Sequence, residues 1–299
     1  MRIAVNGASG FIGGAIATAL AQRGHQFTGF GRTPNGWDHR QADYVEWDIT
    51  RGPRSAEVDA VVHSAALADD RAPLAEAMRV NQLGTRAVLA SFPGARFVHI
   101  STASVYDAFE PNVKVPESAA PVARFLSSYA ESKTAAEREL DGAGAVILRP
   151  HAVYGPGDTT LLPRVMAGIR GRRLVLPEGA RVTHTLTHID NLVDAVELAL
   201  RPEAPAGIYN IGDDTDVLLS AVLTEFLARR GRADVTLTSI PYRAAFAAAS
   251  ALERLQRRPR ITRYAVSQLG MERTLDLTAA RQHLGYNPRP TSLAGAEEW

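Results

Sequence analysis

Cysteine is absent from this 299-residue chain. The absence excludes disulfide bonds, thiolate catalysis and metal sites that depend on cysteine ligands. Charge of one sign is also lacking, because 33 lysine and arginine residues nearly balance 32 acidic residues and leave a net charge of +1. A chain with so little net charge has no strong field to attract nucleic acid or an anionic membrane. We therefore expect neither as a partner.

Long apolar runs are missing too. No stretch reaches the roughly 18 consecutive apolar residues that a membrane-spanning helix needs. The first predicted strand begins at Arg2, which leaves no room for a leader peptide. These features predict a cytoplasmic protein. No set of His, Asp and Glu residues has the spacing of a metal site, so we expect no bound metal.

Lysine is scarce, since Lys114 and Lys133 are the only lysines among the 33 basic residues. A bias of this strength reflects coding composition rather than chemistry. The two lysines that remain are of interest because arginine is a poor substitute where a compact charge must sit beside a titrating group.

Short β-branched runs alternate with longer helical patterns through the first 150 residues. This alternation predicts a parallel, doubly wound sheet. The predicted strands are Arg2–Asn6, Gln26–Gly31, Tyr44–Trp47, Ala60–His63, Phe97–Ser101 and Ala145–Leu148. The predicted helices are Phe11–Gln22, Pro73–Phe92 and Ser127–Asp141.

The second half is less regular. Its predicted helices are Leu161–Gly168, Leu218–Arg230 and Tyr242–Gln256, and Thr185–Ile189 and Ile208–Ile211 are expected to be strands that rejoin the sheet. We therefore expect an α/β fold with a Rossmann-type domain and a smaller C-terminal substrate-binding lobe. The first would hold residues 1–155 and about 183–213, and the second about 156–182 and 214–299.

A glycine-rich loop follows the first strand directly. Gly7, Gly10 and Gly13 have the spacing G-x-x-G-x-x-G, and the helix Phe11–Gln22 begins inside the loop. Glycines let the backbone turn tightly and approach a pyrophosphate, and the start of the helix supplies free N–H donors. The strand–loop–helix context predicts a dinucleotide site. The alternative is a glycine-rich turn without a ligand.

The end of the second strand bears on which dinucleotide binds. An acidic residue there would bind the ribose hydroxyls of NAD, whereas an arginine suits the 2′-phosphate of NADP. Here Gly31 has no side chain and Arg32 follows at once. We predict that NADP(H) is preferred over NAD(H); the alternative is that Arg32 is one of many surface arginines. Asp48, after the third strand, is either an adenine contact or a capping residue.

Tyr129 and Lys133 lie four residues apart on a predicted helix, so they share one face. A free phenol has a pKa near 10, which is too high for a base at neutral pH. A nearby ammonium group and the positive nicotinamide ring would both favour the phenolate. The pair therefore predicts an acid/base tyrosine tuned by a lysine.

A cluster of hydroxyl groups ends the strand Phe97–Ser101. In open α/β sheets ligands bind beyond the carboxyl ends of the strands, so a hydroxyl there would hold the reacting oxygen while Tyr129 exchanges the proton. Thr102 is the first candidate, with Ser101 and Ser104 as others. Ordinary strand-end capping is the alternative for each of them.

Taken together, these motifs resemble the extended short-chain dehydrogenases/reductases, the group that includes NAD-dependent epimerases and dehydratases. The resemblance covers nearly the whole chain in order, through GASGFIG (7–13), VVHSAA (61–66), NQLGT (81–85), HISTASVY (99–106), YAESK (129–133), LRPHAVYGPGD (148–158), THIDNLVDA (187–195), IYNIG (208–212) and LTAARQHLGYNP (277–288).

The resemblance implies roles at the matching positions. Thr102, Tyr129 and Lys133 would be the catalytic residues. The expected cofactor-binding residues are Gly7, Ser9, Gly10, Phe11, Ile12, Gly13, Arg32, Asp48, Ile49, Ala65, Ala66, Asn81, Ser101, Tyr129, Lys133 and Pro150. The helices 73–92 and 127–141 form a dimer interface in many members, so a homodimer is expected.

Two departures narrow the expected reaction. Dehydratases place an Asp-Glu pair directly after the threonine, and here Ala103 and Ser104 follow Thr102, which disfavours dehydration. Many nucleotide-sugar epimerases carry an arginine where this chain has His184, which weakens diphosphate-sugar binding. The resemblance thus implies an NAD(P)-dependent oxidoreductase that moves a hydride between nicotinamide and the carbonyl or secondary alcohol carbon of a small molecule.

Two alternatives remain open at this stage: a nucleotide-sugar epimerase that retains its NAD, and a non-catalytic dinucleotide sensor. The expected substrate-facing residues are Ser104, His151 and His184.

Overall fold

The computed structural model describes residues 1–38, 42–256 and 258–299. Its centre is a seven-stranded sheet of order β12-β7-β5-β4-β1-β2-β3, in which every neighbouring pair is parallel. The strands are β1 Arg2–Asn6, β2 Gln26–Gly31, β3 Asp43–Glu46, β4 Ala60–His63, β5 Arg96–Ile100, β7 Val146–Pro150 and β12 Gly207–Ile211.

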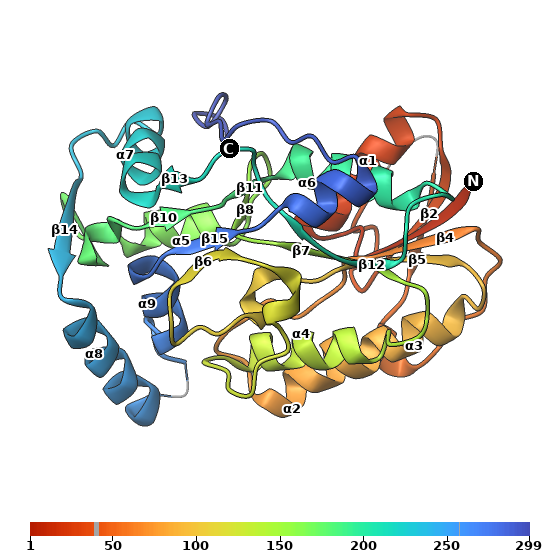
Figure 1. Cartoon of the computed structure of the whole chain (residues 1–299), viewed down its shortest axis with the longest axis horizontal. Coiled ribbons are helices and arrows are strands. Elements are labelled where there is room, and N and C mark those ends of the chain that lie inside the picture. The colour runs from red at the N-terminus through yellow and green to blue at the C-terminus, as the bar shows by residue number, and fades with distance from the viewer. Residues whose placement is uncertain (39–41, 257) are drawn as a thin grey trace.

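Helices cover both faces of this sheet (Figure 1). One face carries α1 (Phe11–Gln22) and α6 (Ile189–Leu200), and the other carries α3 (Gly84–Ser91) and α4 (Ser128–Arg138). Because both faces are buried, apolar residues follow one another without a polar alternation. In β1, Ile3 and Val5 pack into the core beneath α1, and Ala4 packs into the core on the opposite face. The Rossmann-type, doubly wound fold expected from the sequence is confirmed.

The strand order reverses between β1 and β4. From β1 the chain builds outward through β2 and β3, and then returns to β4 and builds the other way. Ligands of open α/β sheets bind at such a switch point, beyond the carboxyl ends of the strands. In the ladder Asn6 is level with His63, so the segments that follow these two residues meet at the same edge.

The remaining strands and helices lie mostly beyond one end of the main sheet, at the left of Figure 1. Three small sheets pair β13-β10-β15-β6, β11-β8 and β14-β9. Their strands are β6 Asn112–Val115, β8 Val153–Tyr154, β9 Arg173–Pro177, β10 Thr183–His184, β11 Thr187–His188, β13 Val217–Leu218, β14 Thr236–Ile240 and β15 Arg273–Leu275. The helices there are α5 Leu161–Gly168, α7 Leu219–Arg229, α8 Tyr242–Leu255 and α9 Arg263–Gly270.

Two sequence predictions need correction. The segment Thr185–Ile189 does not join the main sheet, because only Thr187 and His188 form a strand there, β11, which pairs with β8, and Ile189 begins α6. The helix predicted over 73–92 is not regular, since a π-helical stretch at Met78–Leu83 separates α2 (Leu74–Ala77) from α3. The boundaries predicted for the two domains stay a prediction.

Among the described residues, no helix is both long and apolar enough to cross a bilayer. A cytoplasmic location stays a prediction.

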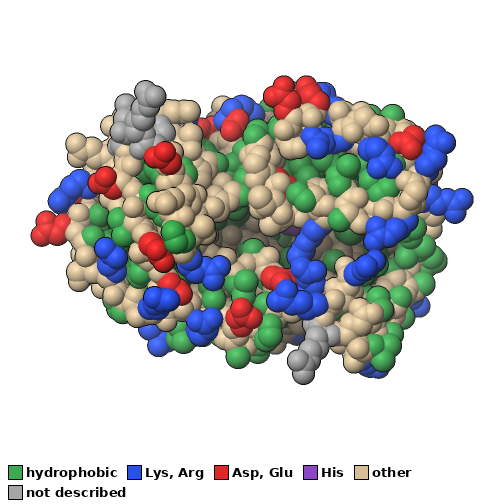
Figure 2. Space-filling view, turned by 180° about the vertical axis from the view of Figure 1, so that it is seen from behind, with side chains coloured by type: hydrophobic (Ala, Val, Ile, Leu, Met, Phe, Trp, Pro, Cys, Tyr) green, Lys and Arg blue, Asp and Glu red, His purple; other side chains and the backbone are tan. Residues whose placement is uncertain are grey.

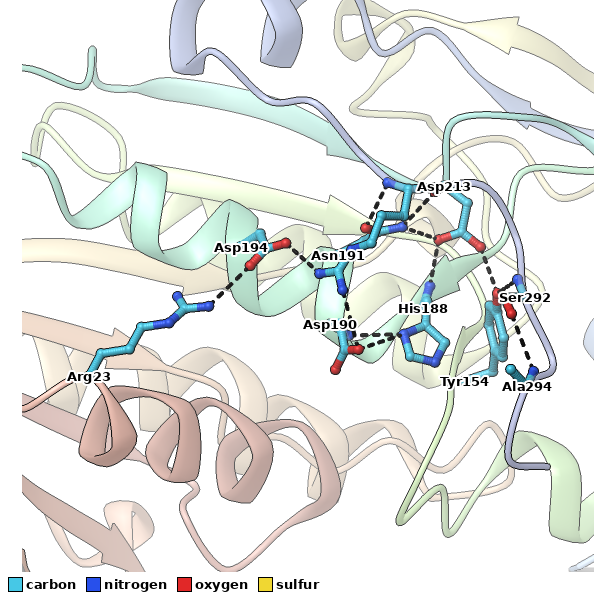
Figure 3. Close-up of polar contacts among 10 residues, drawn as sticks. Arg23, Tyr154, His188, Asp190, Asn191, Asp194, Asp213, Ser292 and Ala294 are labelled. Carbon is cyan, nitrogen blue, oxygen red and sulfur yellow. Dashed lines mark hydrogen bonds and ion pairs between the residues drawn. The ribbon is translucent and has the colours of Figure 1, made fainter. Parts of the chain in front are cut away.

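A buried carboxylate, Asp213, ties the C-terminal segment to the sheet (Figure 3). It is 1% exposed and accepts four hydrogen bonds. One oxygen accepts from the backbone N–H of His188 and the amide of Asn191, both at 2.7 Å. The other accepts from the hydroxyls of Tyr154 at 2.8 Å and Thr291 at 2.9 Å. Three segments distant in sequence, at 154, at 188–191 and at 291, therefore depend on one side chain.

We predict that Asp213→Ala lowers the free energy of unfolding by about 3 kcal/mol, because it leaves several buried donors without an acceptor. Urea denaturation measures this loss. Asp214→Ala is the matched control, since Asp214 is 40% exposed and forms a surface ion pair with Arg281, and its removal should cost about 0.5 kcal/mol. Equal losses in the two variants would contradict the role given to Asp213.

Candidate active site

The glycine loop is held by close backbone approaches. Gly7 has φ +95°, and a Cβ atom there would lie 2.6 Å from the backbone nitrogen of Ala65. A Cβ atom on Gly13 would lie 2.1 Å from the carbonyl oxygen of Gly7. No side chain is possible at either position. Gly10 differs, because the nearest atom to a Cβ there is the Gly7 oxygen at 3.4 Å, so its space is open to a ligand that approaches the backbone.

At the end of β2, Gly31 lies against the ends of two side chains, which would have to move for any larger residue. A Cβ atom on Gly31 would lie 2.5 Å from both the Ser9 Oγ and the Tyr44 hydroxyl. The Tyr44 hydroxyl donates a 2.7 Å hydrogen bond to the Thr33 carbonyl. Arg32 lies near Asp48, and its charge contributes to lowering the pKa of that carboxyl group.

Asp48 caps a short 3₁₀ helix, Ile49–Arg51. One carboxylate oxygen accepts from both the backbone N–H and the hydroxyl of Thr50, at 2.9 and 2.8 Å. These hydrogen bonds are the main reason why the pKa of Asp48 is lowered. Ile49 is buried against Gly84, where a Cβ atom would lie 2.6 Å from the Ile49 side chain. Capping thus explains the position of the Asp48 side chain. Contacts of Asp48 and Ile49 with the adenine stay predictions.

Asn81 lies in the π-helical stretch, a form that often occurs at functional sites. Its side-chain oxygen accepts from the backbone N–H of Leu67 at 2.7 Å, and its amide donates to Ser132 at 2.8 Å. Asn81 therefore joins the loop that contains Ala65 and Ala66 to helix α4.

Helix α4 carries Tyr129 and Lys133 on its inner side. Lys133 is 2% exposed and donates to the Ile100 carbonyl at 2.8 Å, and its Nζ lies 2.9 Å from the His99 Nε2. Removal from solvent lowers the pKa of Lys133 to about 7, although the charge of Glu137 opposes this shift. The ammonium group thus has two of its three hydrogens directed to strand β5.

The pKa of Tyr129 is raised by burial, and a hydrogen bond with the Thr102 side chain opposes the shift. This direction differs from the lowered pKa that the sequence led us to expect. Burial is the reason, and Lys133 donates to Ile100 and lies against His99. The sequence did predict that Thr102 and Tyr129 come together, and the structure brings them into contact.

The three hydroxyls after β5 have different surroundings. Ser101 donates to the carboxylate of Glu137 and therefore faces the core. Thr102 caps the turn Ala103–Val105, accepting from the Ser104 backbone N–H at 3.1 Å, and its hydroxyl donates to the Ser104 Oγ at 3.0 Å. Thr102 and Ser104 thus form a hydrogen-bonded pair beside Tyr129.

The sequence prediction missed Tyr264, which also belongs to this site. Its hydroxyl lies 2.6 Å from the Ser104 Oγ, although the two residues are 160 positions apart. No spacing in the sequence connects Tyr264 with Ser104.

The predicted substrate residues His151 and His184 are buried side by side. The His184 Nε2 lies 3.1 Å from the Met271 carbonyl, which can only accept, so this nitrogen carries the proton in the neutral ring. The His184 Nδ1 then accepts from the His151 Nε2 at 3.5 Å. Burial is the main reason why both pKa values are lowered, that of His184 to about 4.

Burial has the largest effect on the pKa of His151, His184 and Tyr264, and the charge of Arg273 acts to lower all three. This shared influence places the histidine pair in the same region as the hydroxyls. Pro150 ends β7 opposite Ile211 and immediately precedes His151. Figure 2 shows a hollow near the middle of one face, between the part that holds the sheet and the part that holds α8 and α9, with basic side chains gathered along one side.

A model of the NAD dependent epimerase/dehydratase family matches residues 3–212. The chain belongs to this family. It is an extended short-chain dehydrogenase/reductase, as the order of motifs predicted.

Several characterised relatives are similar over almost their whole length. The 4-hydroxy-2-methyl-3-oxo-4-farnesyl-3,4-dihydroquinoline-1-oxide ketoreductase of Stigmatella aurantiaca is 33% identical, over 99% of this chain and 95% of the relative. The 2-alkyl-3-oxoalkanoate reductase of Shewanella oneidensis is 31% identical, over 95% of this chain and 81% of the relative. The 3-beta-hydroxysteroid dehydrogenase of Mycolicibacterium neoaurum is 27% identical, over 96% and 87%.

Solved structures are similar in fold. MoeE5 in complex with UDP-glucose and NAD superimposes with a TM-score of 0.74 at 23% identity, covering 99% of this chain and 96% of that one. The UDP-glucuronic acid 4-epimerase of Bacillus cereus in complex with NAD gives 0.72 at 22% identity, covering 99% and 94%. Family and relatives together make this chain an enzyme of the oxidoreductase and epimerase type.

Proposed function

We propose that this enzyme is an NADP(H)-dependent oxidoreductase that interconverts a ketone and a secondary alcohol. The observation that carries the proposal is the row of hydroxyl groups in which Thr102 joins Tyr129 to Ser104 at the carboxyl end of β5. A carbonyl oxygen placed against Tyr129 and Thr102 would accept a hydrogen bond from the phenol, and a second one from the Thr102 hydroxyl once its hydrogen turns from the Ser104 Oγ to the substrate.

In this proposal NADPH supplies the hydride when it is bound. Tyr129 holds the proton that the substrate oxygen takes as negative charge develops on it, and Thr102 orients that oxygen. The raised pKa of Tyr129 keeps the phenol protonated before reaction, as reduction requires. Lys133 has one N–H beyond those directed at Ile100 and His99, which suits the nicotinamide-ribose contact implied by the family.

Several features favour a net reductase over a nucleotide-sugar epimerase. His184 stands where many epimerases have an arginine, and its lowered pKa keeps it neutral. Its Nε2 is also occupied by the Met271 carbonyl, so His184 is a poor ligand for a diphosphate. The relatives named as reductases act on ketones with large apolar parts, and we extend that substrate type to this chain. An epimerase that retains NAD is the second candidate.

The Tyr129 proposal is tested by Tyr129→Phe. We expect the rate of ketone reduction to fall roughly 100- to 10,000-fold, because the proton donor is removed, while NADPH binding measured by fluorescence stays unchanged. Tyr209→Phe is the control, since the Tyr209 hydroxyl bonds only to the Pro205 carbonyl among the described residues. Near-normal turnover by Tyr129→Phe would refute the assignment. Any turnover above background in the wild type would exclude a non-catalytic sensor.

The cofactor proposal rests on Gly31, which has no side chain to bind the ribose hydroxyls, and on the adjacent Arg32. We expect NADPH to bind at least about tenfold more tightly than NADH, and Arg32→Ala to remove most of that difference. Arg201→Ala, an exposed arginine at the end of α6, is the control. Stoichiometric NAD released from denatured protein would contradict the proposal and favour the epimerase; NADP or an empty site would support it.

We also propose a homodimer through the helices that cover 74–91 and 128–138. The large apolar side chains of Leu74 and Leu83 are 42% and 46% exposed on the first of these segments, as an interface would require. Sedimentation at micromolar protein should give the mass of two chains, and a monomer mass would discard the dimer.

A further inference from the structure

Tyr264 brings a second phenol into the active site from helix α9. Its hydroxyl lies 2.6 Å from the Ser104 Oγ, which lies 3.0 Å from the Thr102 Oγ1. Burial is the main reason why the pKa of Tyr264 is raised, and the charge that Tyr129 carries as a phenolate raises it further, so the two phenols are close neighbours. Tyr129 and Tyr264 thus flank the two smaller hydroxyls of Thr102 and Ser104.

The hydrogen bonds of Ser104 and Tyr264 leave one of their two hydroxyl hydrogens unused. Among the described residues, the Tyr264 hydroxyl contacts only Ser104, and the Ser104 Oγ contacts only Tyr264 and Thr102. The Ser104 oxygen accepts from Thr102, so the hydrogens of Ser104 and Tyr264 have only their mutual bond to share. One of the two hydrogens is therefore free to meet an oxygen that the protein does not supply.

Helix α9 does not need this hydroxyl to stay in place. Thr262 caps the helix by accepting from the Ala265 N–H at 3.0 Å, and its hydroxyl donates to Asp70 at 2.5 Å. Arg263 forms an ion pair with Glu253 at 2.6 Å. Contacts of the two residues that precede Tyr264 thus fix the start of α9, and the phenol oxygen of Tyr264 remains available for another purpose.

We propose that Ser104 and Tyr264 bind a second oxygen atom of the substrate, beside the carbonyl held by Thr102 and Tyr129. This inference rests on the proposed ketone reduction and defines its substrate class: ketones that carry another oxygen on the adjacent carbon or on the next one. Oxygens so placed are separated by about one hydrogen-bond length, which matches the separation of the Thr102 and Ser104 hydroxyls. Tyr264 is then a specificity-determining residue.

The test compares two probes of the same length. Methyl 3-oxooctanoate has an ester carbonyl two carbons from the ketone, and 5-decanone has methylene groups in its place. Isothermal titration to the enzyme saturated with NADP⁺ gives dissociation constants without turnover. We expect the wild type to bind the ester about tenfold more tightly than the plain ketone, since one hydrogen bond is added.

Tyr264→Phe should abolish most of this preference by weakening ester binding alone, with 5-decanone affinity unchanged. Tyr242→Phe is the matched control on the neighbouring helix α8 and should keep the preference. Equal weakening of both probes would show that Tyr264 only holds α9, and would overturn the proposal. So would a wild type that binds the probes equally or binds neither.

Failure of the proposed reaction would look different. If the ester preference is present and depends on Tyr264, yet NADPH is not oxidised by either probe, the oxygen site stands and the reductase is wrong. If both ketones are reduced with equal kcat/KM in the wild type and in Tyr264→Phe, the reductase stands and the second oxygen site is wrong.

Discussion

The close approach of the chain at Gly7 is the constraint on which the rest of the site depends. Strand β1 ends at the switch point of the sheet, and the loop after it passes within van der Waals contact of the segment that follows β4. Only a residue without a side chain, with a positive φ, fits between Ala65 and Gly13 there. This contact sets where α1 begins, and so where its free N–H groups face the ligand space.

Buried ionic groups fix helix α4 against the sheet. Arg149 of β7 is 1% exposed and pairs with Glu137 at 2.6 Å, one turn beyond Lys133. The same guanidinium reaches the Tyr106 hydroxyl at 3.1 Å, after the turn that contains Thr102 and Ser104. A buried pair of this kind contributes little net stability but is costly to break. The pair of Arg149 and Glu137 therefore holds α4 at one position against the sheet, which keeps Tyr129 beside Thr102.

The C-terminal part of the chain supplies the side chains that surround a substrate bound at Thr102 and Tyr129. The β10–β15 pairing places His184 level with Arg273. Helix α9, which directly precedes β15 in the chain, brings Tyr264 into the site. In the proposed function, the neutral pair of His151 and His184 and the phenol of Tyr264 favour neutral, oxygen-bearing substrates over a diphosphate. The same fold thus supports different substrates through residues outside the nucleotide-binding half.

Periodicity and local motifs were sufficient for the nucleotide-binding half. The strands β1, β2 and β4 and the glycine loop follow from residues within a few positions of one another, and so does the shared helix face of Tyr129 and Lys133. The contact of Thr102 with Tyr129 could also be expected, because strand ends of a parallel sheet meet at one edge.

By itself, then, the sequence determined the fold class, the family and the catalytic threonine, tyrosine and lysine as candidates. Only the tertiary structure decided the direction of the Tyr129 pKa shift, because that depends on burial. It also decided that 187–188 pairs with β8 outside the main sheet, and that Tyr264 lies next to Ser104. Each of these results from contacts between distant segments, for which no local pattern exists in the chain.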